Sequence, residues 1–230
     1  MKTFLTLFFL VFSNSLFAQK TEILHAVNSL GAPIYSAPSF DSQLVGLVEA
    51  SNNIYVDKTI DKKVKKRISK DLELEGSWYQ LNLDLNFGYV HSSDFSAKPT
   101  ELIIEHSDLQ TVKLFGKELE KKEFTEQTVI DGISYPVKKR VTAYEFATIN
   151  ETFFDGCHNT EYLLVGFTLS EAYHQLINLH SRKNNNRIEI PSIISREGNV
   201  WNLSDLDAIQ ELKLHDLRDG KFKITLYSCT

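Results

Sequence analysis

The stretch Gly76-Ser-Trp-Tyr-Gln-Leu-Asn-Leu-Asp-Leu-Asn-Phe-Gly-Tyr-Val-His91 contains two neighbouring strand signals. Apolar and polar residues alternate from Trp78 to Leu83 and again from Phe87 to Val90, which predicts two half-buried β-strands. A similar short run, Ile54-Tyr55-Val56, lies upstream, and turn residues separate the runs. Short strands with little helical periodicity predict an all-β unit that ends near residue 97.

Four short motifs follow one another along this unit. They are Gly31-Ala-Pro-Ile-Tyr-Ser-Ala-Pro-Ser39, Val45-Gly46, Gly76-Ser-Trp-Tyr-Gln-Leu81 and Phe87-Gly-Tyr-Val-His-Ser-Ser-Asp-Phe95. In content and order they resemble the motifs of the bacterial SH3 (SH3b-type) domain family. The resemblance implies a small SH3-like β-barrel over residues 19–97, which acts as a non-catalytic binding module of the cell envelope.

The same resemblance implies an aromatic groove that binds a cell-wall peptide or an envelope protein. The matching positions are Tyr35, Trp78 and Tyr89, and Asp94 stands where the family usually has tyrosine. Tryptophan and tyrosine suit such a groove, because their large rigid faces lose little conformational entropy on binding. Each of these aromatic side chains could instead fill the core of the barrel.

A basic insertion, residues 57–75, interrupts the expected strands. Its segment 58–70 carries seven basic residues and one acidic residue, a local charge of +6. The densest part, Lys62, Lys63, Lys65, Lys66 and Arg67, predicts a patch that attracts an anionic envelope component. The apolar residues Ile60, Val64, Ile68 and Leu72 fit one face of a helix or one face of a hairpin equally well. A solvated hairpin whose lysines discourage edge pairing is the alternative to a binding patch.

The first residues have the layout of a secretory signal peptide. Lys2 precedes an apolar run from Phe4 to Phe12, and Ala18 lies before a polar segment, which predicts cleavage after residue 18. A run of about nine apolar residues cannot cross a bilayer that needs roughly 20. No later run is long enough either, so we expect a secreted protein, periplasmic or extracellular, without a transmembrane segment.

A second domain, residues 100–230, is predicted after Pro99. Segments of strand character surround three Asp-Gly pairs, at 131–132, 155–156 and 219–220, each typical of a hairpin turn. Thr168 and Glu171 have the spacing of a capping box, and apolar residues at helical spacing follow over about 169–181. A second short helix is possible near 204–208. This pattern predicts an α+β domain, in which one principal helix covers an antiparallel sheet, so the chain as a whole is mainly β.

Both cysteines, Cys157 and Cys229, belong to this second domain. In an oxidising compartment we expect them to form a disulfide. The alternative is that Cys157, followed by His158, is the nucleophile of a cysteine hydrolase. Adjacent residues of a strand point to opposite faces, which argues against a thiolate–imidazolium pair.

Composition and missing motifs narrow the function further. The chain has 25 basic and 30 acidic residues, a net charge of −5, which provides no overall basic field for nucleic acid. No His-x-x-x-His, Cys-x-x-Cys, Gly-x-Ser-x-Gly or P-loop motif occurs, so no metal, cofactor or catalytic residue is predicted. We expect a non-catalytic binding protein. The alternative is a periplasmic inhibitor or immunity-type protein that blocks a lytic enzyme.

Overall fold

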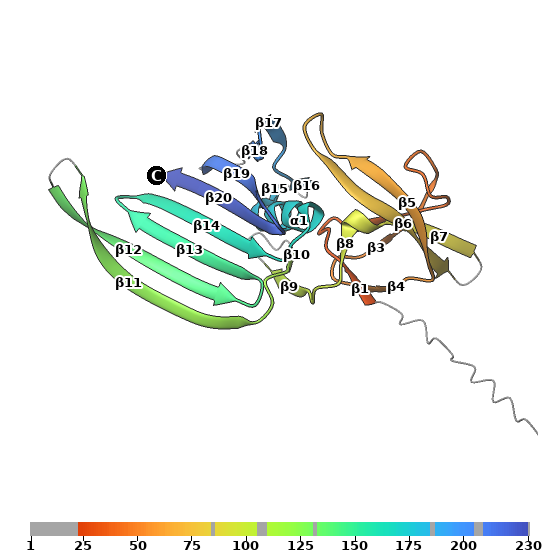
Figure 1. The fold of residues 1–230 in the computed structure, drawn as a ribbon, viewed down its shortest axis with the longest axis horizontal. Coiled ribbons are helices and arrows are strands. Elements are labelled where there is room, and N and C mark those ends of the chain that lie inside the picture. The colour runs from red at the N-terminus through yellow and green to blue at the C-terminus, as the bar shows by residue number, and fades with distance from the viewer. Residues whose placement is uncertain are drawn as a thin grey trace, which may run out of the picture.

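The structure is a computed structural model that describes residues 23–83, 86–104, 110–130, 133–184, 187–204 and 209–229. Within these ranges the protein is mainly β, with several antiparallel sheets and a single α-helix (Figure 1). The mainly β prediction is therefore confirmed. The predicted signal peptide and most of the predicted short helix at 204–208 lie outside the described residues.

The N-terminal unit, here residues 23–98, consists of two antiparallel sheets. One sheet has the order β4-β1-β8 and the other has the order β3-β2-β7-β6-β5. Neither sheet is closed, so the barrel implied by the resemblance is not confirmed as a continuous barrel. The strands are β1 (Ile23–Ala26), β2 (Ala32–Tyr35), β3 (Leu44–Val48), β4 (Asn53–Tyr55), β5 (Lys58–Arg67), β6 (Glu73–Leu83), β7 (Asn86–His91) and β8 (Phe95–Ser96), with the 3-10 turn η1 (Ser92–Asp94) before β8.

A small apolar core lies between these two sheets. Strand alternation explains which residues enter it, because consecutive side chains of a strand point to opposite faces. Leu81 of β6 and Val90 of β7 point into this core, whereas Trp78 lies on the other face of β6. The core residues are Leu24, Ala26, Ala32, Ile34, Ile54, Leu81, Val90 and Phe95.

The basic insertion is a hairpin formed by β5 and β6. Lys65 pairs with Glu75 and Arg67 with Glu73, and the ladder has an irregularity between Ile60 and Val64. The hairpin interpretation of the four-residue spacing is thus confirmed, and the helical alternative is wrong. Period-2 alternation and period-4 spacing select the same even-numbered residues here, which is why sequence alone left both open.

The C-terminal unit, residues 99–229, is built on an eight-stranded antiparallel sheet with the order β11-β12-β13-β14-β20-β19-β18-β17. The predicted antiparallel sheet with one principal helix is confirmed. The elements are β9 (Glu101–Ile104), β10 (Gln110–Lys113), β11 (Glu118–Ile130), β12 (Ile133–Tyr144), β13 (Ala147–Phe154), β14 (Cys157–Val165), α1 (Leu169–His180), β15 (Arg182–Asn184), β16 (Arg187–Glu189), β17 (Ile193–Glu197), β18 (Val200–Leu203), β19 (Ile209–Arg218) and β20 (Lys221–Cys229).

Helix α1 begins with the predicted capping box. The Glu171 backbone amide donates to Thr168 Oγ1 at 3.2 Å, and the Thr168 amide donates to Glu171 Oε2 at 2.8 Å. Apolar side chains of α1, including Leu176 and Ile177, pack on alternate residues of β19 and β20, such as Leu214 and Ile224. The helix therefore covers one face of the sheet with its apolar side.

Two of the three Asp-Gly pairs form the predicted hairpin turns. Asp155 and Gly156 have φ of 44° and 77° between β13 and β14, and Asp219 and Gly220 have φ of 51° and 70° between β19 and β20. Positive φ at both central residues is what a type I′ turn requires. The Asp131-Gly132 pair lies outside the described residues. The sequence pattern predicted no separate strands at the positions of β13, β15, β17 and β18.

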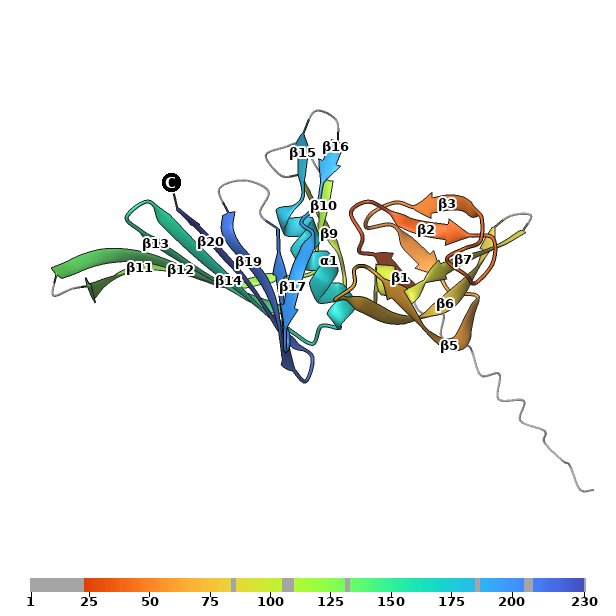
Figure 2. The same cartoon turned by 90° about the horizontal axis from the view of Figure 1, so that it is seen from above.

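The two units share one apolar core. Val27, Leu72 and Leu74 of the N-terminal unit belong to the same buried cluster as α1 and the eight-stranded sheet. Trp201 Nε1 of β18 donates to the Asp71 carbonyl at 2.9 Å, so the tip of the β5–β6 hairpin is fixed to the C-terminal unit. In Figure 2, α1 lies between the large sheet and the N-terminal unit. The basic insertion, residues 57–75, therefore packs against the C-terminal unit at its tip.

Candidate functional site

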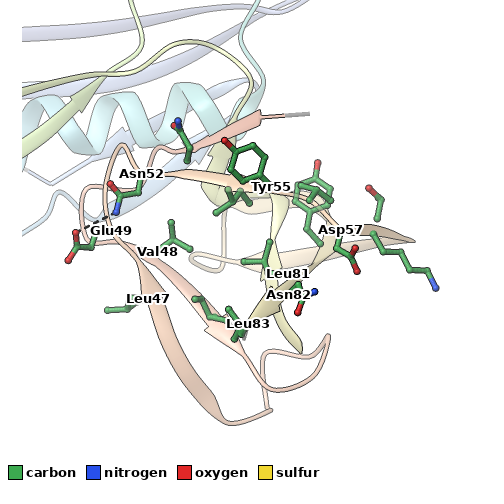
Figure 3. A pocket seen from close by; sticks show the side chains of 16 residues that line it. Leu47, Val48, Glu49, Asn52, Tyr55, Asp57, Leu81, Asn82 and Leu83 are labelled. Atoms are coloured by element: carbon green, nitrogen blue, oxygen red, sulfur yellow. Dashed lines mark hydrogen bonds between the residues drawn. The ribbon is translucent and has the colours of Figure 1, made fainter. Parts of the chain in front are cut away.

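The first candidate binding feature is an open groove between the two sheets of the N-terminal unit. Its volume is about 800 Å³. Figure 3 shows Leu47 and Val48 of β3 on one side, Tyr55 of β4 on another and Leu81 of β6 beneath them. Leu81 and Ile34 also line the groove, and both are buried members of the core, so the floor of the groove is the outer edge of a closed core. We call this feature the groove.

Two well-exposed apolar side chains, Leu47 and Tyr55, form the apolar wall of a groove whose lining is otherwise mixed polar and apolar. Tyr55 is 64% exposed and Leu47 is 56% exposed. The rim is polar, with Asn52 hydrogen-bonded to Glu49 and with Asn82 and Asp57 on the opposite side (Figure 3). An apolar floor with a few polar groups around it is typical of ligand sites.

A second hollow of about 870 Å³ adjoins the groove and shares Asn82 and Leu83 with it. Val45 and Phe87, which are 47% and 52% exposed, line it together with Tyr89. The predicted ligand-binding residue Tyr89 therefore faces a hollow, although its neighbours differ from those predicted. We call this feature the side hollow.

Free strand edges accompany the groove. Among the described strands, β3 pairs with β2 alone and β4 pairs with β1 alone. One edge of each strand is therefore available beside the apolar wall. An available strand edge can accept an added strand through backbone hydrogen bonds.

Trp78 does not line a groove, because its side chain is buried. Its ring contacts Tyr35 edge-on at 5.4 Å between centroids, and Phe40 covers it at 4.8 Å. His91 lies on the next strand at 5.5 Å. The core alternative is therefore the correct one for Trp78. Tyr35 is half-buried at the margin of this aromatic cluster.

Asp94 does not line a groove either. It is buried, and both of its carboxylate oxygens accept hydrogen bonds from Lys66 Nζ, at 2.7 and 2.6 Å. His174 Nε2 of α1 lies 3.3 Å from Asp94 Oδ1. Asp94, which stands where SH3b domains usually have tyrosine, thus lies where the N-terminal unit meets α1. The four predicted groove residues do not form one site.

The charges around Asp94 determine the pKa values nearby. Burial raises the pKa of its carboxyl, but His174 and Lys66 lower it by more, so the pKa of Asp94 lies well below its ordinary value. The Tyr173 hydroxyl, buried and near this carboxylate, has its pKa raised to about 12. These groups form a buried polar junction, which we define as Lys66, Asp94 and His174.

A second buried ion pair lies beside this junction. Lys98 Nζ donates to both Glu171 carboxylate oxygens at 3.0 Å, and the Ser96 hydroxyl also donates to Glu171. Asn178 of α1 donates to the carbonyls of Val27 and Val112, at 2.8 and 2.9 Å. Buried polar groups paired in this way hold the two units in one relative orientation.

The predicted basic patch is only partly a surface patch. Lys63, Lys65 and Arg67 are exposed, and Lys65 pairs with Glu73 at 3.1 Å. Lys66 points inward to Asp94, so its assignment to the patch is wrong. Its even number puts it on the apolar face of the hairpin, and alternation could have revealed this. The side chain of Lys62 lies outside the described residues.

The cysteine prediction agrees with the structure. Cys157 and Cys229 stand opposite each other on β14 and β20, with Cα atoms 4.0 Å apart and sulfur atoms at disulfide distance. Both cysteines of the chain are thus paired, and the Cys157 thiol is not available as a nucleophile in this state.

The described residues contain no cluster of three or more His, Cys, Asp or Glu side chains arranged to hold a metal ion. Over the same part of the chain, no helix has the length and apolar content needed to span a bilayer. Comparisons with protein-family models, curated proteins and solved structures found no match.

Sequence reasoning missed the residues that line the groove. Leu47 and Tyr55 belong to short runs that read only as strands, and nothing in their spacing indicates which face remains uncovered. His174 of α1 belongs to no motif in the sequence. Its role depends on a neighbour 80 positions earlier in the chain, which no local pattern reveals.

Proposed function

We propose that this protein is a secreted, non-catalytic binding protein of the cell envelope and that the groove is its binding site. The ligand is an extended peptide segment, either a wall peptide or a segment of an envelope protein. The observation that supports this most directly is the pair of well-exposed apolar side chains, Leu47 and Tyr55, that line the groove beside two free strand edges.

The chemistry of the groove favours a peptide over a small polar solute. Apolar side chains of a peptide would cover Leu47 and Tyr55, which removes apolar surface from water. The rim amides of Asn52 and Asn82 can donate to and accept from a peptide backbone.

The strand edges beside the groove suit the same ligand. A peptide that lies along β4 or β3 would satisfy its backbone groups by strand addition, while its alternate side chains enter the groove and the side hollow. The resemblance to SH3b modules agrees with a binding role. The likeness does not locate the site, because Trp78 and Asp94 are buried in this chain.

The test uses the chain without residues 1–18, since the shared core requires both units. Retention on purified sacculi and on an immobilised library of short peptides is measured for the wild type and for Leu47→Ala and Tyr55→Ala. Both side chains are more than half exposed, so we expect the variants to fold normally and to bind roughly tenfold more weakly, as substituted interface anchors do.

The matched control is Ile194→Ala on β17, which removes a similarly exposed aliphatic side chain, 59% exposed, from the other unit. It should bind as the wild type does. Equal loss in the control, or unchanged binding of both groove variants, would contradict the proposal. Retention on sacculi alone identifies a wall peptide, and retention on the peptide library alone identifies a protein segment.

A further inference from the structure

The edge strand β11 has features that the binding proposal does not use. In the described part of the sheet β11 pairs with β12 alone, and Figure 1 shows it as the outermost strand along the lower margin. It is 13 residues long, and its regular ladder with β12 runs from Glu120 to Ile130. A long exposed edge is a site where another strand can add.

We propose that a second copy of this chain pairs with β11. The two β11 strands run antiparallel about a two-fold axis at Phe124, so the two eight-stranded sheets continue as one. A two-fold axis perpendicular to the sheet keeps each face on its own side. Residues of even number must therefore face residues of even number, which leaves few registers to consider.

The sequence of β11 is complementary to itself in this register. Lys122 falls opposite Glu126 of the other copy, and the symmetry repeats this ion pair. Phe124, 40% exposed, falls opposite its own copy, which gives an aromatic pair on the axis. At the bulge beyond, Leu119 falls opposite Val129, and these side chains are 63% and 68% exposed.

The neighbouring registers are less favourable. An axis at Glu123 places Glu123 opposite its own copy and Glu120 opposite Glu126. Because the symmetry repeats the second pair, the interface contains three pairs of like charges. An axis at Lys122 sets Lys121 opposite Glu123, but it also places two lysines opposite each other and Glu118 opposite Glu126. An axis at Thr125 creates no opposite-charge pair and sets Phe124 against Glu126. Of these four registers, only the axis at Phe124 combines opposite charges with apolar pairs.

The existing ion pairs of β11 are compatible with this register. Lys122 Nζ lies 2.8 Å from Glu120 of the same strand, and Glu126 pairs with Lys139 of β12. In the dimer these two pairs join across the interface into an alternating row of charges. The pairing leaves the groove of each copy open, because β11 lies at the opposite end of the molecule from β3 and β4 (Figure 1).

A charge exchange tests the register directly. Sedimentation of the chain without residues 1–18 over a dilution series should show a monomer–dimer equilibrium. Lys122→Glu creates two repulsive pairs and should raise the dimer dissociation constant by roughly tenfold or more. The double variant Lys122→Glu/Glu126→Lys restores opposite charges and should recover the dimer.

The control is Lys121→Glu, which changes the net charge equally but faces the neutral Gln127 in this register. It should leave the dimer unchanged. Equal weakening by Lys121→Glu, or no recovery in the double variant, would overturn the register. A wild-type protein that stays monomeric over the whole dilution series would overturn the proposal. The charges of β11 would then serve to prevent pairing of an exposed edge strand.

Single cysteines give a second test that does not depend on affinity. Both native cysteines are paired, so an introduced cysteine is the one free thiol. Phe124→Cys places two thiols opposite each other on the axis, at a separation that a disulfide can span, and should form a covalent dimer on oxidation. Thr128→Cys faces Glu120 instead and should stay monomeric. The reverse result would contradict the arrangement.

Discussion

The ammonium of Lys66 and the carboxylate of Asp94 form a buried ion pair in which Nζ donates to both oxygens, at 2.7 and 2.6 Å. The Asp94 side chain is 2% exposed, and that of Lys66 is 18% exposed. His174 of α1 completes the group, so one carboxylate links the β5–β6 hairpin to the helix of the other unit. The pair therefore stabilises the junction between the two units.

Asp94→Asn should destabilise the folded protein by about 3 kcal/mol, because removal of one partner leaves the Lys66 charge buried without compensation. Urea denaturation measures the change. The control Asp71→Asn removes a partly exposed carboxylate, 27% exposed and 3.9 Å from Lys70, and should change the free energy of unfolding by less than about 0.5 kcal/mol.

The stabilisation by Asp94 should depend on pH. Its pKa in the folded state lies below the ordinary value of 3.8, so the unfolded state takes up the proton first as the pH falls. The difference in unfolding free energy between wild type and Asp94→Asn should be full above about pH 5 and should shrink as the pH falls below about 4. A difference that grows with acidity would contradict this assignment.

Loss of the disulfide should lower stability by about 4 kcal/mol in the chain-entropy model, since Cys157 and Cys229 are 72 positions apart. The double variant Cys157→Ser/Cys229→Ser, compared with the wild type by urea denaturation, gives the value. Thiol labelling of the unfolded wild-type protein should detect no free thiol. Detection of two thiols would show that the bond is absent in the isolated protein.

Gly76→Ala should destabilise the N-terminal unit by about 1–3 kcal/mol through overpacking. A Cβ at Gly76 would lie 2.6 Å from both His91 Cε1 and Ser92 Oγ. Gly46→Ala is the control, because its nearest contact, Ile34 Cδ1, lies at an ordinary 3.5 Å. Thermal unfolding of both variants compares the effects, and equal melting temperatures would contradict the crowding at Gly76.

Local chemistry made much of the fold predictable. The Thr168 and Glu171 capping box and the Asp155-Gly156 turn depend on neighbouring residues, and both appear where expected. The pairing of Cys157 with Cys229 was predicted because the chain has two cysteines and an expected oxidising compartment. The SH3b function and the secretory address remain predictions, since the structure does not test them.

Contacts between distant segments were not predictable in the same way. Alternation along β5 can place Lys66 on the inward face, but its partners Asp94 and His174 come from distant segments. Trp78 looks like a groove residue until Phe40 covers it. In each case the burial of a side chain depends on a segment that no local pattern brings near.

The shared core has a mechanical consequence. Val27, Leu72 and Leu74 are packed under α1, so the groove and the β11 edge belong to one rigid body and not to two modules on a tether. A peptide held in the groove would therefore be kept at a constant distance and angle from β11. A dimer formed there would present its two grooves with a fixed spacing, which favours a partner that repeats its binding segment at that spacing.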